Sequence, residues 1–255
     1  MRKIFLPALA FVIAACAPTT RPISVPPDLE RTLLERLEHS GGQFSSLEGI
    51  AKVRVVNPEK TVSATQVLLA EKPDKLRSEI LSPFGTPMLL MATDGHELTV
   101  YVPSEARFYR GEASDANIRR LLRIPMRLDD LVDILLYDLP IFDYRQVRAD
   151  VEDNRRFVLT LDGEGGSRQV IRFDRELQLA GARYIVEGDV LLEVDYQFNA
   201  SPSGYPSRVS VQMPQQQSSV SVAFSEVENN TEIPPDRFRL TPPAGVDVTP
   251  IPDNR

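Results

Sequence analysis

The sequence is poor in the residues that carry most enzyme chemistry and covalent cross-linking: its 255 residues include one cysteine, two histidines and no tryptophan. A single cysteine excludes an intrachain disulfide, so the apolar core must stabilise the folded state. His96 has no second histidine four residues later, as a zinc-protease helix requires, and the chain has no Gly-x-Ser-x-Gly nucleophile motif. We therefore predict a protein that is not an enzyme and that needs neither a cofactor nor a metal ion.

Long apolar runs are also absent after the first residues of the chain, so we expect no transmembrane helix in the mature protein. At the N-terminus, Arg2 and Lys3 precede an apolar run from Ile4 to Ile13, and the sequence Ile-Ala-Ala-Cys ends at Cys16. The run is too short to span a membrane stably, and this pattern is typical of a bacterial lipoprotein signal peptide over residues 1–15. The alternative is a buried N-terminal helix with an incidental cysteine.

Lipidation of Cys16 predicts permanent attachment to a membrane, because two or three acyl chains bind far more firmly than one. Ala17 follows the cysteine, and the aspartate that retains many lipoproteins in the inner membrane is absent. We therefore expect an anchored protein of the bacterial outer membrane that faces the periplasm. Residues 16–27 contain four prolines and little to bury, which predicts an extended tether between the lipid and the folded domain.

The composition is acidic. The formal net charge is −7, and it becomes −9 when Arg2 and Lys3 are removed with the signal peptide. An acidic surface repels phosphate backbones, so we expect no nucleic-acid partner. We expect residues 28–249 to form a single, monomeric domain and residues 250–255 to form a C-terminal tail.

Hydrophobic spacing predicts one helix followed by many strands. Leucine recurs every fourth residue after Asp28, a suitable N-cap, which predicts a helix over residues 29–39 that ends before Gly41. From Phe44 the period changes to two, and turn signals interrupt it at short intervals. The predicted strands span residues 46–56, 61–71, 74–82, 86–93, 96–102, 106–110, 144–150, 154–162, 168–174, 178–187, 190–198, 206–213 and 218–227.

The alternating pattern is interrupted once, over residues 114–137. Residues 114–123 and 128–137 have the apolar spacing of helices, and Pro125 separates them. A strongly twisted sheet of a dozen or so strands cannot stay flat, so it should close or half-close into a barrel. We therefore predict a mainly β fold with antiparallel strands, an N-terminal helix and a helical insertion that fills the barrel or covers it as a lid.

Several short motifs resemble the LolA/LolB superfamily of bacterial lipoprotein carriers and receptors. They are Glu71 to Arg77 (EKPDKLR), Ser82 to Gly85 (SPFG), Asp94-Gly95 with Leu98, Tyr101 and Pro103, and the closing stretch Phe238 to Val246. The closing stretch is similar to the soluble carrier LolA, whereas the lipobox, SPFG and Leu135 to Pro140 look more like the anchored receptor LolB. The resemblance implies an unclosed, half-open β-barrel with a helical lid over an apolar cavity that holds acyl chains.

A lipid site needs apolar side chains around a cavity, and flexible methionines suit a ligand of variable shape. An unbroken apolar run over residues 88–91 follows Phe84, and such a run implies burial on both faces of its strand. A strand covered wholly by protein and ordinary packing of helix on sheet are the alternatives. The candidate lipid-binding residues are Phe84, Met88, Leu90, Met91, Leu121, Leu122, Leu131, Leu135, Leu136 and Phe142.

Four arginines crowd the helical insertion of this acidic chain: Arg119, Arg120, Arg123 and Arg127. Such a cluster is suited to phosphate headgroups, an acidic partner or an anionic membrane surface, and a solvated helix face is the alternative. The nearby Asp129, Asp130 and Asp133 favour the N-terminal end of a helix and do not require a metal ion.

Two functions from different classes are consistent with these patterns. In the first, the domain binds acyl chains in its cavity and helps to deliver lipoproteins or other lipids to the outer membrane. Its partners are then the membrane, acyl chains and a periplasmic carrier protein. In the second, it is a lipid-anchored, non-catalytic interaction or assembly module whose barrel is filled. An empty apolar cavity between sheet and helices distinguishes the two.

Overall fold

The structure is a computed structural model that describes residues 24–122, 126–152, 156–199 and 204–252. The predictions for the signal peptide, for Cys16 and for most of the tether fall outside these residues, as does the one for Arg123. The side chain of Leu122 is also outside the description.

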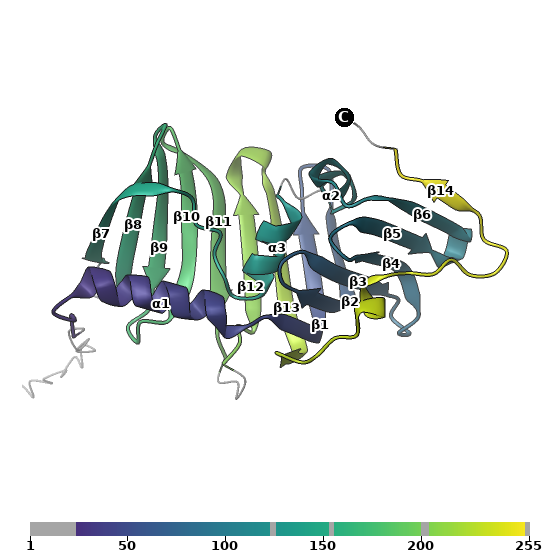
Figure 1. The fold of residues 1–255 in the computed structure, drawn as a ribbon, viewed down its shortest axis with the longest axis horizontal. Coiled ribbons are helices and arrows are strands. Elements are labelled where there is room, and N and C mark those ends of the chain that lie inside the picture. Colours follow the sequence, from purple (N-terminus) through teal and green to yellow (C-terminus); the bar gives the residue numbers. More distant parts are fainter. Residues whose placement is uncertain (1–23, 123–125, 153–155, 200–203, 253–255) are drawn as a thin grey trace, which may run out of the picture.

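Within the described residues, fourteen strands form one continuous sheet, in the order β14-β6-β5-β4-β3-β2-β1-β13-β12-β11-β10-β9-β8-β7. The strands are β1 Ser46–Val56, β2 Thr61–Glu71, β3 Lys75–Leu81, β4 Pro87–Thr93, β5 Glu97–Val102, β6 Arg107–Glu112, β7 Tyr144–Glu152, β8 Arg156–Gly163, β9 Ser167–Phe173, β10 Leu179–Val186, β11 Asp189–Gln197, β12 Arg208–Met213, β13 Ser218–Asn229 and β14 Val248–Pro250. The sheet curves around its helices without closing, because β7 and β14 lie at opposite ends (Figure 1). The predicted mainly β, half-open barrel is confirmed.

All thirteen predicted strands are present, each within two residues of its predicted bounds. They form because apolar and polar residues alternate, so that one face of each strand is buried. In β1, for example, Ala51 and Val53 are buried while Lys52 and Arg54 are exposed. Within the two meanders, β1–β6 and β7–β13, consecutive strands pair antiparallel, and β13 also pairs with β1 and joins the meanders.

The strand β14 was not predicted. Its three residues pair parallel to β6, and the N–H of Ile251 donates to the backbone oxygen of Arg110 at 2.7 Å. The side chain of Ile251 is buried in the main core, beside Gly111. A segment this short has no period to read, so only its place beside β6 makes it a strand.

The N-terminal helix α1, Leu29–Gln43, packs against β7, β8 and β10 through Leu33 and Leu37. The expected end at residue 39 was wrong, because the helix continues through Gly41. A side chain there would lie 2.5 Å from Asp138 Oδ1, so glycine serves a close approach and does not end the helix.

The expected side-chain cap of α1 by Asp28 is also wrong. Its carboxylate accepts no hydrogen bond from the backbone N–H groups of the first helical turn and pairs instead with Arg31 at 3.1 Å. The backbone oxygen of Asp28 instead accepts the N–H of Thr32 at 3.0 Å, which begins the helical ladder.

The insertion forms two short helices, α2 Asp115–Leu122 and α3 Leu128–Leu135. Together they cover the concave face of the sheet, with α3 over its middle and α2 toward β6 (Figure 1). We call this pair the helical lid. The outer face of β2–β6 is covered by the chain after β13, whose 3-10 turn Pro235–Phe238 places Phe238 against Leu69. Both faces of this part of the sheet are thus packed against protein.

Candidate functional site

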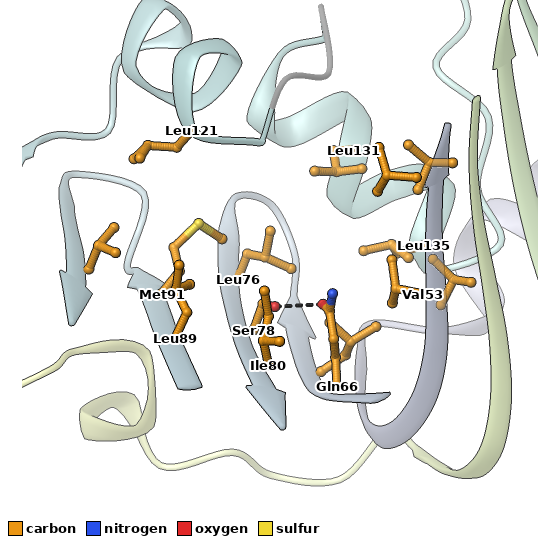
Figure 2. A pocket seen from close by; sticks show the side chains of 15 residues that line it. Val53, Gln66, Leu76, Ser78, Ile80, Leu89, Met91, Leu121, Leu131 and Leu135 are labelled. Atoms are coloured by element: carbon orange, nitrogen blue, oxygen red, sulfur yellow. Dashed lines mark hydrogen bonds between the residues drawn. The ribbon is translucent and has the colours of Figure 1, made fainter. Parts of the chain in front are cut away.

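An apolar cavity of about 230 Å³ lies between the concave face of the sheet and the helical lid (Figure 2). Its walls come from β1–β5 and β13, and α2 and α3 cover it. Thirteen of its fifteen lining side chains are apolar. The lining residues are Val53, Val55, Gln66, Leu68, Leu76, Ser78, Ile80, Leu89, Met91, Val100, Leu121, Leu131, Leu135, Val220 and Val222.

The strand β4 shows how the apolar run after Phe84 is used. Leu89 and Met91 line the cavity, whereas Leu90 points to the outer face and packs with the cluster around Phe108. Met88, at the start of the strand, is 54% exposed. The two faces of the strand therefore serve different layers, because successive side chains alternate across the sheet.

Leucines of the helical lid form the opposite wall of the cavity. Leu121 comes from α2, and Leu131 and Leu135 come from α3 (Figure 2). Leu135 is buried, while Leu121 is 39% exposed. The wall is therefore most closed at Leu135 and more open under α2.

The other candidate lipid-binding residues lie elsewhere. Leu136 is fully buried in the main core, and Phe142 is half-buried beside Gly163. Phe84 is 95% exposed in the turn between β3 and β4. None of these three lines the cavity.

Most of the lining residues were not singled out from the sequence. They include Val53 on β1, Leu68 on β2 and Val222 on β13. Strand alternation marks them as inward-facing, but it marks every other core residue in the same way. Only the pairing of the strands and the position of the lid separate the cavity wall from the filled core.

The core on the β7–β12 side of the sheet is filled by aromatic rings. Tyr137 packs edge-on against Tyr196 with ring centroids 4.9 Å apart, and Phe44 packs edge-on against Tyr205 at 5.2 Å. Burial raises the pKa of the Tyr196 hydroxyl well above its usual range, so this group stays a neutral hydrogen-bond donor.

Two of these tyrosines hold the end of the lid. The Tyr196 hydroxyl shares its single hydrogen between the backbone oxygens of Ile134 at 3.1 Å and Asp138 at 3.0 Å. The Tyr205 hydroxyl donates to the backbone oxygen of Leu135. Carbonyl groups at the C-terminal end of a helix have no partner within it, so these bonds satisfy them and fix α3 in place.

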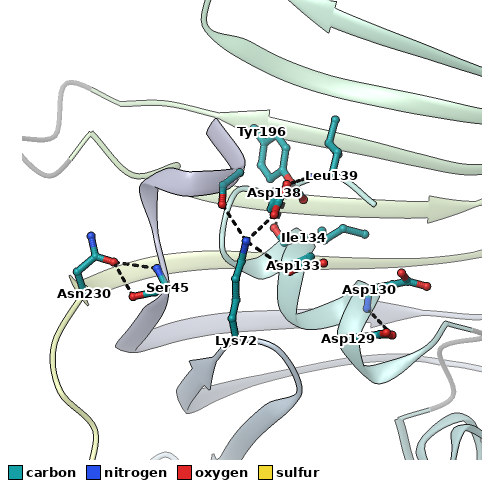
Figure 3. A network of polar contacts seen from close by, with 11 residues as sticks. Ser45, Lys72, Asp129, Asp130, Asp133, Ile134, Asp138, Leu139, Tyr196 and Asn230 are labelled. Carbon is teal, nitrogen blue, oxygen red and sulfur yellow. Dashed lines mark hydrogen bonds and ion pairs between the residues drawn. The ribbon is translucent and has the colours of Figure 1, made fainter. Parts of the chain in front are cut away.

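A charged network fixes the same end of α3 to the rest of the fold (Figure 3). Lys72, in the turn between β2 and β3, donates to the backbone oxygen of Gly41 at 2.8 Å and to the Asp138 carboxylate. Its Nζ also lies 3.5 Å from Asp133 on α3. Burial, together with the Asp138 carboxylate, raises the pKa of Asp133 despite the nearby ammonium group. One lysine thus joins α1, the β2–β3 turn and the lid.

The three arginines of the insertion that the structure describes are exposed. Arg119 and Arg120 lie on the outer side of α2, and Arg120 donates to the Asn117 side chain at 3.3 Å. Arg127 precedes α3 and pairs with Asp129, whose negative charge raises the pKa of the guanidinium. Among the described residues, no group of three or more histidine, cysteine, aspartate or glutamate side chains is placed to hold a metal ion.

No helix in the described part of the chain is long and apolar enough to cross a membrane. No family model matches the sequence, and no curated protein matches it.

Solved structures with the same fold do exist. A DUF1329 family protein from Desulfovibrio piger has 15% identity and a TM-score of 0.55, with 85% of this chain and 98% of that chain covered. A LolA superfamily protein from Nitrosomonas europaea has 17% identity and a TM-score of 0.51, with 83% and 97% covered. A putative outer membrane lipoprotein-sorting protein domain from Vibrio parahaemolyticus has 14% identity and a TM-score of 0.50, with 81% and 94% covered.

Proposed function

We infer that the likeness to LolA superfamily proteins, in the fold and in the motifs around Ser82 to Gly85 and Phe238 to Val246, extends to function. We propose that this protein binds acyl chains in the cavity under its helical lid and helps to deliver lipoproteins or other lipids to the bacterial outer membrane. We further propose that residues 1–15 are a signal peptide, that lipid on Cys16 anchors the chain, and that residues 16–27 form the tether.

The apolar cavity is the observation that supports this proposal most. Ligand sites are concave, mostly apolar and open enough for entry, and typical volumes are roughly 300–1,000 Å³. The cavity of about 230 Å³ lies just below that range, so it suits one flexible chain better than a bulky ring system. Met91 in its wall adds a side chain that can repack around different chains.

The alternative, an interaction module with a filled barrel, is less well supported. Its interior should be packed throughout, as it is around Phe157 and Phe173. The wall around Leu89 and Leu131 is instead only half-buried, although both residues are leucines on regular elements. Leaving apolar side chains without partners weakens a core, so the opening is better explained by a ligand.

Phe84 supports the delivery step. This large apolar side chain is 95% exposed at a hairpin turn. Its transfer from water into an apolar environment would be favourable. Met88, 54% exposed, lies four residues further along the same hairpin. We propose that this turn contacts the membrane surface, while the cavity holds the acyl chain.

The cavity is tested by a matched pair of methionines. Met91 and Met213 are both buried, at 3% and 2% exposure, but only Met91 lines the cavity. Met91→Lys should lower the affinity for a fluorescent acyl probe by at least about tenfold and should lower stability by less than Met213→Lys does. Met213→Lys should lower the free energy of unfolding by several kcal/mol, because its charge has no cavity to enter.

These variants are measured in the full chain carrying Cys16→Ala, so that no anchor lipid competes with the probe. Native mass spectrometry of the same protein, purified from bacterial cells, should show co-purified lipid. If the parent protein carries no lipid and binds no probe, acyl binding is excluded and the interaction module is favoured.

The anchor is tested separately by the location of the Cys16→Ala protein in cells. Without the acylation site, the folded protein should leave the membrane fraction, because the tether makes no expected core contact. Outer membranes washed in high salt should retain the parent protein and lose the variant. A variant that stays with the membranes contradicts anchoring through Cys16.

A further inference from the structure

The apolar cavity contains one polar contact. The Ser78 hydroxyl on β3 donates a hydrogen bond of 2.7 Å to the Oε1 atom of Gln66 on β2 (Figure 2). These are the two polar residues among the fifteen that line the cavity. Polar groups in an apolar wall lower stability unless their hydrogen bonds are made, so the pair requires an explanation.

The strand register places the pair at the boundary between the deep and the outer wall. Ser78 lies opposite Leu68 on one side and Met91 on the other, and both of these are buried. Gln66 lies opposite Ile80, and both are half-buried. If the hydrocarbon chain of a ligand fills the deep part, the group attached to the outer end of that chain therefore lies beside Gln66.

The hydrogen-bonding capacity of Gln66 is only partly used. A glutamine amide has one acceptor oxygen and two N–H donors, and Ser78 occupies the oxygen. Within the described residues, no group accepts a hydrogen bond from the amide nitrogen of Gln66. Because the oxygen accepts from the Ser78 hydroxyl, the amide nitrogen points away from that bond. The nitrogen is therefore available to a ligand.

The charge of the wall indicates which acceptor fits. Among the described residues, no lysine, arginine, aspartate or glutamate lines the cavity. A carboxylate or phosphate buried beside a neutral amide alone would lose far more hydration than one hydrogen bond returns. A neutral carbonyl oxygen loses little and gains a bond of ordinary strength.

We infer that Gln66, oriented by Ser78, donates a hydrogen bond to the carbonyl oxygen of an acyl ester or amide whose hydrocarbon chain fills the apolar part of the cavity. This inference rests on the proposed function and extends it. It names the ligand class as acyl chains in ester or amide linkage, and it makes Gln66 the residue that distinguishes them from plain alkyl chains.

The test compares two competitors that differ only in the carbonyl group. Dioctanoylglycerol and its dioctyl ether analogue displace a fluorescent alkyl probe from the full chain carrying Cys16→Ala. The parent protein should bind the ester about fivefold more tightly than the ether, as one net hydrogen bond provides. Gln66→Met keeps the length of the side chain and removes its donors, so the two affinities should become equal while ether binding is retained.

Two further variants keep the result specific. Gln212→Met makes the same change on the exposed face of β12 and should preserve the fivefold preference. Ser78→Ala removes the group that orients the amide and should lower the preference to about twofold. Thermal melts of every variant establish that each one is folded.

Different outcomes contradict the inference about Gln66 and the proposed function on which it rests. If the parent protein binds ester and ether equally, or if Gln66→Met keeps the preference, the inference is wrong and acyl binding stands. If neither competitor displaces the probe from the parent protein, the proposed function is wrong and the inference falls with it. An unchanged preference in Ser78→Ala contradicts the orienting role of the serine.

Discussion

The two halves of the sheet, divided along the order of its strands, are covered by different helices. We define the filled half as β7–β12, covered by the fifteen-residue α1, and the cavity half as β1–β6 with β13, covered by two helices of eight residues each. The filled half contributes rings such as Phe157 and Phe173, both without exposed surface. The cavity half contributes valine, leucine and methionine to the space under its helices.

This difference shows how one sheet can combine a rigid core with a binding cavity. Aromatic rings fill a large volume, and tyrosine hydroxyls of the filled half bond to the carbonyl groups of α3. The lid is thus attached at one end by the filled half. Over the cavity half, short helices with branched side chains leave part of the space unfilled. A cavity forms where the cover is short.

The largest expected effect is on the free energy of unfolding, when a ring of the filled half is removed; a leucine of the cavity wall is removed for comparison. Phe173→Ala should lower the free energy of unfolding by about 3–5 kcal/mol, because it opens a hole in a packed core. Leu89→Ala should lower it by less than about 2 kcal/mol, because Leu89 already borders empty space. Urea unfolding measures both, and Phe84→Ala, at an exposed turn, is the neutral control. Equal losses for Phe173 and Leu89 would remove the distinction between the halves.

A smaller effect concerns the loss of stability at low pH, to which a carboxylate of the cavity half contributes. Although burial raises the pKa of Asp94, hydrogen bonds from the backbone N–H groups of Glu97 and His96 and from Arg239 outweigh it and lower the pKa to about 2. The folded state therefore binds this proton less readily than the unfolded chain. The resulting stability is present above the ordinary aspartate pKa and is lost as the pH falls through about 2.

Asp94→Asn should remove this contribution of about 1 kcal/mol at pH 5 and flatten the fall in stability between about pH 4 and pH 2. Urea unfolding across that range measures it. In the filled half, burial raises the pKa of Glu193, but Arg172 and Arg183 outweigh burial and lower it, so part of the acid sensitivity should remain. An unchanged pH dependence in Asp94→Asn contradicts the assignment to Asp94.

The smallest effect on stability is expected at the lid surface. Replacing Arg119 and Arg120 together by glutamine should change the free energy of unfolding by no more than about 0.5 kcal/mol, since both side chains are exposed. Association of the Cys16→Ala protein with anionic vesicles should nevertheless fall, most clearly at low salt. Arg145→Gln with Arg148→Gln, on the edge strand of the filled half, is the matched control and should leave vesicle association unchanged. A large loss of stability in the lid variant would contradict a surface role.

Much of the fold follows from short-range patterns. The alternation of Ala51 and Val53 with Lys52 and Arg54 is enough to predict β1, and the same signal predicts twelve further strands. The change to helical spacing between residues 114 and 137 predicts α2 and α3. Signals of this kind fail where a distant contact decides. Gly41 lies inside α1, where it leaves room for Asp138 and does not end the helix, and β14 pairs with the edge of β6.

The candidate site was less predictable than the fold. Met91, Leu121, Leu131 and Leu135 were named from the sequence and lie at the cavity. Phe84 was named with them, because a phenylalanine next to an apolar run suggests burial, but the turn holds it in solvent. Ser78 and Gln66 gave no signal, since a single polar residue on a strand is ordinary until its partner and its surroundings are known.

The sequence by itself determined the strands, the helical insertion and the face of each strand that turns inward, because these depend on residues a few positions apart. Only the tertiary structure decided which inward faces meet rings and which meet a cavity. Val53 and Val222 belong to the same wall although 168 intervening residues separate them along the chain. Periodicity reports that a side chain points inward, but not what lies opposite it. The volume left between sheet and lid depends on packing across those distances, which no local pattern records.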